Sequence, residues 1–241
     1  MNIQTATVLV TGANRGIGAA LVKAFLEAGV KKIYATARDV SRLNAIAALD
    51  PSRVVPLPLD VTSAEQVEQV AAVATDINLL INNAGSLTFG DILEIPAEAI
   101  AQQLDTNFYG PLRLARVFAP VIEGNGGGTI VNFLTLLSMV SAPGMSAYNA
   151  SKAAAWSMTQ SLRASLSDTS VAVCGVFPGA IDTDMLAGVE IAKTSPINVA
   201  AAVVAGVAAG KEDIFPDPMS TQVYAAWTQD HKAVEKQFAT M

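Results

Sequence analysis

The chain of 241 residues is 51% hydrophobic and 15% charged, with a mean hydropathy of +0.40, so it can bury a large core and is not a disordered chain. A formal net charge of −6 and scattered lysines and arginines argue against nucleic-acid binding, and no apolar run reaches the ~20 residues of a membrane span. One histidine and one cysteine argue against a histidine-based triad, a multi-histidine metal site and an intramolecular disulfide, so we expect no metal and a cytoplasmic protein.

Short runs of β-branched and apolar residues recur along the chain, and each is followed by a turn and a helical pattern. Continuously apolar runs are typical of parallel strands that helices cover on both faces. We therefore predict a doubly wound, Rossmann-type α/β fold with a mostly parallel sheet in three αβα layers, formed by residues 1–241 as a single domain. The predicted strands are TVLV at 7–10, KIYATA at 32–37, VVPLPLDV at 54–61, LLINNAG at 79–85, TIVNFLTL at 129–136 and VAVCGVFPG at 171–179.

Helix boundaries are marked by caps and glycines. AALVKAFLEAG places its apolar residues on one helical face and ends at Gly29, which suits a C-cap. Ser63 precedes AEQVEQVAAVA and Gln66 follows three residues later, a pattern that predicts a capping box. EGNGGG at 123–128 lies between a helical pattern and a strand, so we expect a connection there and no domain boundary.

A glycine-rich loop follows the first predicted strand. The sequence TGANRGIG places Gly12, Gly16 and Gly18 between that strand and a helix. Glycines allow the backbone to turn tightly and to approach a diphosphate, and the amides at a helix N-terminus favour an anion. This position predicts a dinucleotide-binding loop.

The end of the second strand predicts the choice of dinucleotide. An acidic residue there would bind free ribose hydroxyls, whereas this chain has Ala37 followed by Arg38. Arg15 projects from the glycine loop nearby, and two guanidinium groups can hold a 2′-phosphate. We therefore expect NADPH to be preferred over NADH.

Tyr148 and Lys152 are the predicted acid and its electrostatic partner. A Pro-Gly turn precedes a strong helix-forming segment, so the two side chains lie one turn apart on the same helix face. A phenol with an ordinary pKa near ~10 is a poor proton donor at neutral pH, and a neighbouring ammonium lowers that pKa by favouring the phenolate. The pair is suited to general acid–base chemistry.

In the order of its motifs the chain resembles the compact branch of the short-chain dehydrogenase/reductase family over nearly its whole length. The motifs are TGANRGIG at 11–18, DVT at 60–62, NNAG at 82–85, Asn107 in NFYG, Tyr148-x-x-x-Lys152 and PGAIDTDM at 178–185.

The resemblance implies further site roles. Asp60 and Val61 would contact the adenine, Thr183 the nicotinamide carboxamide, and Lys152 the nicotinamide ribose, while Asn107 would bind a water that links Lys152 to solvent. The implied cofactor-binding residues are Gly12, Asn14, Arg15, Gly16, Ile17, Gly18, Arg38, Asp60, Val61, Asn82, Ala84, Gly85, Tyr148, Lys152, Pro178, Gly179, Ile181 and Thr183.

The hydroxyl that would polarise a substrate carbonyl has two candidates. The family usually places a serine 13 residues before the tyrosine, and that position here is Thr135, whose extra methyl restricts the side chain. Ser138 is the competing candidate. We favour Thr135 because it shares the strand and register of the family's serine.

Together these features predict an NADPH-dependent enzyme that reduces a ketone or aldehyde reversibly, with the proton taken from Tyr148. The segments 86–89, 138–145 and 185–191 are mostly apolar and lack lysine and arginine, which favours a small hydrophobic carbonyl substrate. The alternatives are an NAD(P)-dependent alcohol, polyol or hydroxysteroid dehydrogenase, and a non-catalytic NADP(H)-sensing protein. A homodimer or homotetramer is expected from Leu112, Leu114, Val117, Phe118, Trp156 and Met158, although core packing would explain them equally.

Overall fold

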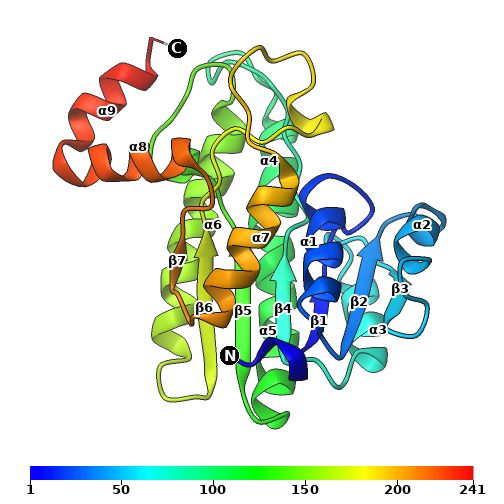
Figure 1. The fold of residues 1–241 in the computed structure, drawn as a ribbon. Coiled ribbons are helices and arrows are strands. Elements are labelled where there is room, and N and C mark those ends of the chain that lie inside the picture. Colours follow the sequence, from blue (N-terminus) through cyan, green and yellow to red (C-terminus); the bar gives the residue numbers. More distant parts are fainter. Residues whose placement is uncertain (241) are drawn as a thin grey trace.

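A seven-stranded parallel sheet forms the centre of the computed structural model, which describes residues 1–240 (Figure 1). The strand order is β3-β2-β1-β4-β5-β6-β7, so the chain reverses its direction of travel across the sheet after β3. This arrangement confirms the doubly wound α/β fold. The strands are β1 Thr7–Val10, β2 Lys32–Ala37, β3 Val54–Pro58, β4 Leu79–Asn82, β5 Gly128–Phe133, β6 Val171–Val176 and β7 Asp213–Ile214.

The six predicted strands are confirmed, and four of them end earlier than the apolar pattern suggested. Residues 83–85 and 134–136 leave the sheet and enter the loops at its carboxyl edge. The short strand β7 was missed because two residues, Asp213 and Ile214, give no periodic signal; it pairs with Gly175 and Val176 of β6.

Helices cover both faces of the sheet. Val8 and Val10 of β1 pack with α1 and α7, which also contact each other, whereas Leu9 faces α3 and α5. This alternation gives the three αβα layers seen in Figure 1. The helices are α1 Gly16–Glu27, α2 Asn44–Ala47, α3 Ala64–Val73, α4 Ala97–Leu104, α5 Gly110–Gly124, α6 Ser146–Ser165, α7 Pro196–Ala208, α8 Pro218–Gln229 and α9 His231–Phe238, with short turns η1 Ile3–Thr5, η2 Val40–Leu43, η4 Leu136–Ser138 and η5 Asp184–Leu186 and a π-helical turn η3 Asp105–Tyr109.

The predicted caps are mostly present. Gly29 follows α1 with φ of 80°, and Ser63 Oγ accepts a hydrogen bond from the Gln66 amide at the start of α3. The Gln66 side chain does not complete the capping box, because its Oε1 accepts from the amide of Asp60 at 2.7 Å. Gln66 thus fastens the end of β3 to α3.

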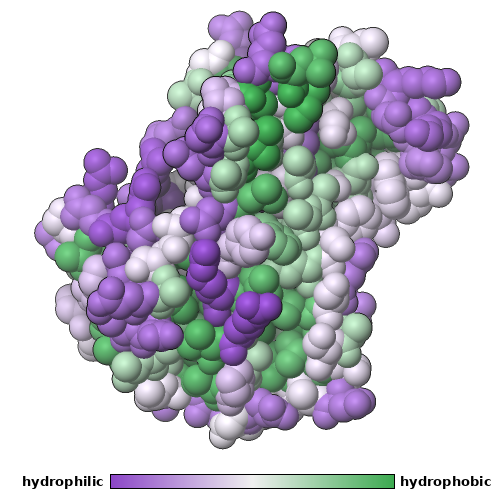
Figure 2. Space-filling model, turned by 180° about the vertical axis from the view of Figure 1, so that it is seen from behind, coloured by the Kyte–Doolittle hydropathy of each residue, from purple (hydrophilic) through white to green (hydrophobic). Residues whose placement is uncertain are grey.

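Three of the six residues that suggested a subunit interface belong to the core, namely Leu114, Phe118 and Met158. The other three, Leu112, Val117 and Trp156, are partly exposed. Figure 2 shows that the rear face of the molecule carries apolar as well as hydrophilic residues. The homo-oligomer stays a prediction that rests on these three residues.

The C-terminal helices pack beside the end of β5. Val234 and Phe238 of α9 lie against Leu136 and Val140, with Trp227 of α8 packed on the same cluster. The segment that follows β5 is therefore covered by the C-terminal helices (Figure 1).

Thr11 ties the end of β1 to the end of β4. Its hydroxyl accepts hydrogen bonds from the amides of Asn83 and Ala84 at 3.0 and 2.9 Å and donates to the Ile81 carbonyl at 3.2 Å. Thr11 is buried, so these amides depend on it in place of water.

Replacing Thr11 by valine should lower the free energy of unfolding by about 2 kcal/mol, because two amides lose their acceptor inside the fold. Thr11→Ser keeps the hydroxyl and serves as the matched control. Urea unfolding followed by circular dichroism measures both variants. Equal stability of the two variants would contradict the role assigned to the hydroxyl.

Candidate active site

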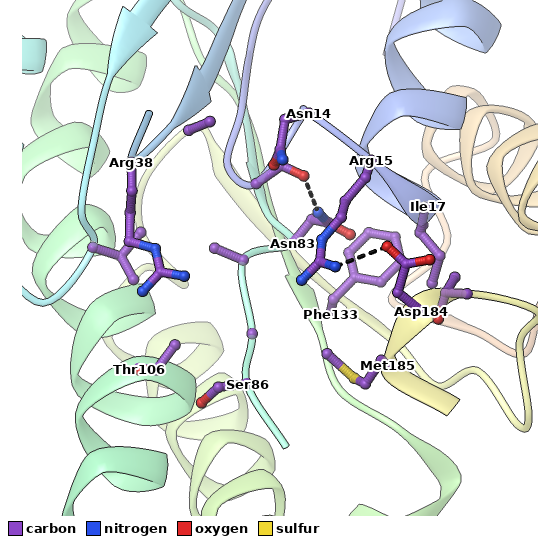
Figure 3. A pocket seen from close by; sticks show the side chains of 18 of the residues that line it. Asn14, Arg15, Ile17, Arg38, Asn83, Ser86, Thr106, Phe133, Asp184 and Met185 are labelled. Atoms are coloured by element: carbon purple, nitrogen blue, oxygen red, sulfur yellow. Dashed lines mark hydrogen bonds and ion pairs between the residues drawn. The ribbon is translucent and has the colours of Figure 1, made fainter. Parts of the chain in front are cut away.

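A cavity of about 760 Å³ opens at the carboxyl ends of the strands (Figure 3). It extends from the glycine loop past the ends of β2 and β3 to Tyr148 and Lys152 on α6. In doubly wound sheets ligands bind at this edge, where the strand order reverses. The position and size suit a dinucleotide together with a small molecule.

The glycine loop is shaped by close backbone contacts. Gly12 and Gly16 have φ of 64° and 55°, and a Cβ on Gly18 would overlap the carbonyl oxygen of Gly12. Asn83 donates to the carbonyls of Thr11 and Gly12 at 2.8 and 3.3 Å. The loop is therefore held open toward the cavity, and all of its predicted residues line it: Gly12, Asn14, Arg15, Gly16, Ile17 and Gly18.

Arg15 and Arg38 both line the cavity but do not come together. Figure 3 shows Arg38 on one side, whereas Arg15 extends toward Asp184 and forms an ion pair at 2.8 Å. The expected pairing of the Arg15 and Arg38 guanidinium groups is therefore not present. Arg42 lines the cavity on the side of Arg38 instead, where it also contacts Asp39. The sequence signal for Arg42 was its place one helical turn after Arg38.

The residues predicted to contact the adenine and ribose are mostly in place. Asp60, Val61, Ala84 and Gly85 line the cavity. Asn82 does not line the cavity, since its side chain is buried in the sheet and donates to Asn132 Oδ1 at 2.8 Å.

Asn83, the next residue, lines the cavity instead of Asn82. Successive side chains of a strand point to opposite faces, so a motif alone could not tell which of the two amides would face the cofactor. The loop after β6 shows a similar division. Pro178 and Thr183 line the cavity, whereas Ile181 is 4% exposed in the core, and the Gly179 amide donates to Asp217.

Lys152 is a buried cation with one protein partner. Its Nζ donates to the Phe133 carbonyl at the end of β5 at 2.7 Å, and the side chain is 5% exposed. The same Nζ lies 5.8 Å from the ring centroid of Tyr148, one helical turn earlier on α6. An ammonium group has three donors, so two have no partner among residues 1–240, and Lys152 lines the cavity.

Burial decides the protonation of this pair. It raises the pKa of Tyr148 to about 12, with a smaller opposing effect from a hydrogen bond to Thr135, and it lowers the pKa of Lys152 to about 8. The expectation that Lys152 lowers the pKa of Tyr148 is therefore wrong for the ligand-free protein, because desolvation raises that pKa and the smaller lowering effect comes from Thr135. Tyr148 is the protonated acid at neutral pH, and Lys152 is mostly charged.

Thr135 and Ser138 occupy different places in the turn after β5. The Thr135 hydroxyl contacts the Tyr148 phenol, donates to the Pro178 carbonyl at 3.1 Å and accepts from the Leu137 amide. Ser138 Oγ accepts from the Thr135 amide at 3.2 Å and completes a capping box of η4. Of the two hydroxyls, Thr135 is the one beside the predicted acid.

Asn107 lies in the π-helical turn η3, a feature that is frequent at functional sites. Its side-chain Oδ1 accepts from the Ser86 amide, and its Nδ2 donates to the Ser86 carbonyl, both at 2.9 Å. The same Nδ2 donates to Ser151 Oγ at 2.9 Å. Ser151 in turn donates to the Tyr148 carbonyl at 2.8 Å. Asn107 therefore ties the end of β4 to α6, and one lone pair of Oδ1 remains for the predicted water.

Three further lining residues had no individually predicted role, although Asp184 and Met185 belong to the PGAIDTDM motif and Met185 begins the segment 185–191. Gln103, Asp184 and Met185 line the cavity from α4 and η5. When the side-chain amide of Gln103 is oriented so that its nitrogen and its oxygen both have partners, it donates to the Ser86 carbonyl at 2.7 Å and accepts from Thr88 Oγ1 at 3.0 Å. It therefore fastens the loop after β4.

The fold, the glycine loop and the Tyr148–Lys152 pair define a dinucleotide-binding oxidoreductase scaffold. The model of the short chain dehydrogenases matches residues 6–194. The chain belongs to the short-chain dehydrogenase/reductase family of oxidoreductases, which confirms the resemblance seen in its motifs.

Similar proteins cover much or all of the chain. A solved short chain dehydrogenase from Burkholderia cenocepacia in complex with NADP is 38% identical over 99% of both chains, with a TM-score of 0.93. One from Sphingobium yanoikuyae in complex with NADPH is 27% identical, covers 96% of this chain and 95% of its own, and has a TM-score of 0.82. The short chain dehydrogenase pigC of Monascus ruber is 32% identical over 75% of this chain, which spans 64% of that relative.

None of the helices within residues 1–240 combines the length and apolar composition that crossing a membrane requires.

The low pKa of Lys152 makes stability depend on pH in the ligand-free protein. Between pH 8 and 10 the unfolded chain binds this proton more tightly than the folded one, so the contribution of Lys152 to the free energy of unfolding rises with pH. From pH 7.5 to 9.5 the rise is about 2 kcal/mol.

The measurement compares wild type with Lys152→Met by urea unfolding at several pH values. The difference between the two cancels other titrating groups, such as Cys174, whose pKa burial raises to about 12. A difference that stays flat across this range would contradict the burial of a titrating Lys152.

Proposed function

We propose that the protein is an NADP(H)-dependent carbonyl reductase that converts a ketone or aldehyde to an alcohol, and that the reaction is reversible. The observation that carries the proposal is that Tyr148 and the buried Lys152 line one end of a cavity whose other end is a glycine loop, with the buried Thr135 hydroxyl close enough to lower the pKa of the Tyr148 phenol.

The residues present fit a nicotinamide dinucleotide. The Gly12–Gly18 turn leaves no space for side chains next to the backbone, as a loop that cradles a diphosphate requires. The free donors of Lys152 suit ribose hydroxyls, and Thr183 lines the region assigned to the carboxamide. When bound, the cofactor supplies the hydride.

The protein side chains supply the proton. Tyr148 is protonated at neutral pH and donates its proton to the alkoxide oxygen that develops at the substrate. Thr135 donates a hydrogen bond to the same oxygen by turning its hydroxyl away from Pro178. The Lys152 cation favours the phenolate that remains, and Asn107 holds the loop that closes this end of the cavity.

Arg38 and Arg42 support a preference for NADPH. Both line the cavity at the end of β2, where Ala37 stands in place of an acidic residue. A guanidinium binds a phosphate through charge-assisted hydrogen bonds. The complexes of the Burkholderia cenocepacia and Sphingobium yanoikuyae relatives with NADP and NADPH agree with this preference.

The entrance near Tyr148 supports a hydrophobic substrate. Met185 lines the cavity and is 40% exposed. Phe89, Ile92 and Leu93 are also exposed, and they continue the segment whose Ser86 and Thr88 line the cavity. Polar residues also line the cavity from the same loop and from α4, among them Ser86, Thr88, Gln102 and Gln103.

Consumption of NADPH with a panel of aryl and aliphatic ketones tests the proposed reaction. Tyr148→Phe should lower kcat by about 10³-fold, because the general acid is lost, and should leave the Kd for NADPH within a few fold. Tyr224→Phe, in an aromatic stack away from the cavity, is the control. Failure of wild type to oxidise NADPH with any carbonyl would refute the reductase.

The cofactor preference has its own test. Ala37→Asp combined with Arg38→Leu should shift kcat/KM from NADPH toward NADH by about 10²-fold, because the acidic group repels the 2′-phosphate and bonds the free ribose. Arg42→Leu should weaken NADPH binding more than Arg15→Leu, since Arg42 lies on the side of Arg38 and its contact with Asp39 is longer, at 3.7 Å, than the 2.8 Å contact of Arg15 with Asp184. An unchanged preference would show that the 2′-phosphate is not read at this strand end.

A further inference from the structure

Asp217 is a buried acidic residue between the C-terminal helices and the loop after β6. It is 4% exposed and caps α8, with Oδ1 accepting from the Ser220 amide at 2.9 Å. Its Oδ2 accepts from the Gly179 amide at 2.8 Å. Among residues 1–240 no ion pair involves Asp217, so amide N–H groups are its partners.

The peptide unit between Pro178 and Gly179 connects Asp217 to the active site. Its N–H donates to Asp217, while its carbonyl accepts from the Thr135 hydroxyl at 3.1 Å and from the Leu136 amide at 3.0 Å. Hydrogen bonds on the two sides of one peptide unit polarise each other and strengthen together. A continuous chain of contacts thus runs from Asp217 to Thr135, which contacts the Tyr148 phenol.

The residue at position 179 permits this contact. A Cβ on Gly179 would lie 2.9 Å from Asp217 Oδ1 and 3.1 Å from the Met219 Cβ. A side chain there would therefore push the start of α8 away from the loop. The absence of a side chain has a structural reason even though Gly179 does not line the cavity.

We infer that Asp217 is a positioning residue for the Thr135–Tyr148 pair, acting through the Pro178–Gly179 peptide. It fixes the Pro178 carbonyl, and that carbonyl holds the Thr135 side chain and the turn that follows β5 in place, so that the hydroxyl needs only to rotate its hydrogen from Pro178 to the substrate oxygen. The inference rests on the proposed function for its catalytic consequence. Its structural part, the control of residues 134–138 by Asp217, stands on the contacts alone.

Asp217→Asn and Ser220→Ala separate positioning from helix capping. The asparagine has one acceptor oxygen in place of two, so it cannot serve both Gly179 and Ser220. Ser220→Ala removes the other half of the same capping box, where Ser220 Oγ accepts from the Asp217 amide, and leaves Gly179 untouched. The two variants should lose similar amounts of Tm.

Only Asp217→Asn should change catalysis. We expect about a tenfold loss of kcat with ketone and NADPH and a smaller change in KM, because Thr135 and Tyr148 are misplaced while the rest of the cavity is kept. In a Thr135→Ala background, Asp217→Asn should lower kcat less than twofold, because the hydroxyl through which Asp217 acts is already absent. Equal losses in both backgrounds, or an equal loss with Ser220→Ala, would overturn the inference.

A second readout is independent of turnover. Amide hydrogen exchange in residues 134–138 of the ligand-free protein should accelerate in Asp217→Asn and stay unchanged in Ser220→Ala. If wild type shows no turnover, the proposed function fails, and this exchange still decides the positioning role. Should Asp217→Asn not fold, Gly179→Ala displaces Asp217 and should give the same acceleration; unchanged exchange in the folded variant would overturn the inference.

Discussion

The hydrogen bond from Lys152 Nζ to the Phe133 carbonyl fixes the end of the cavity where Tyr148, the proposed acid, lies. It attaches α6 to the carboxyl end of β5, and burial of the cation around it holds the pKa of Lys152 at about 8. Tyr148 lies one turn before Lys152 and Thr135 lies two residues after Phe133, so this one contact brings phenol and hydroxyl together. A cation buried with a single carbonyl is costly unless a ligand uses its remaining donors, which is why it marks a binding site.

Parallel strands supply the rest of the arrangement. The carboxyl ends of β1, β4, β5 and β6 are adjacent in the sheet, and each leads into a loop that is tied to its neighbour by buried polar groups. Thr11 joins the first two ends, Asn107 joins the β4 loop to α6, and the Pro178 carbonyl joins the β5 and β6 loops. The position of each reactive group is therefore set by contacts between segments far apart in sequence.

Local patterns were enough to predict six of the seven strands, the glycine loop and the Tyr148–Lys152 spacing, because each depends on residues close in the chain. They could not predict that Arg15 pairs with Asp184, 169 positions away, or that Asp217 reaches Gly179. They also could not assign Asn82 to the sheet and Asn83 to the cavity, since that depends on where β4 ends. The reversed pKa expectation for Tyr148 has a similar cause, because sequence shows a charged neighbour but not the depth of burial.

The pairing of Arg15 changes how a 2′-phosphate would be held. Arg15 and Asp184 are 63% and 72% exposed, and an ion pair this exposed is worth about 0–1 kcal/mol, so it can open at little cost. Arg15 therefore connects the glycine loop to Asp184 of η5 through a weak contact. Arg38 and Arg42 at the end of β2 carry the cationic charge that stays on the adenosine side. In the function proposed above, the 2′-phosphate is bound by Arg38 and Arg42, while Arg15 contacts η5, so the two sides of the cavity can change independently.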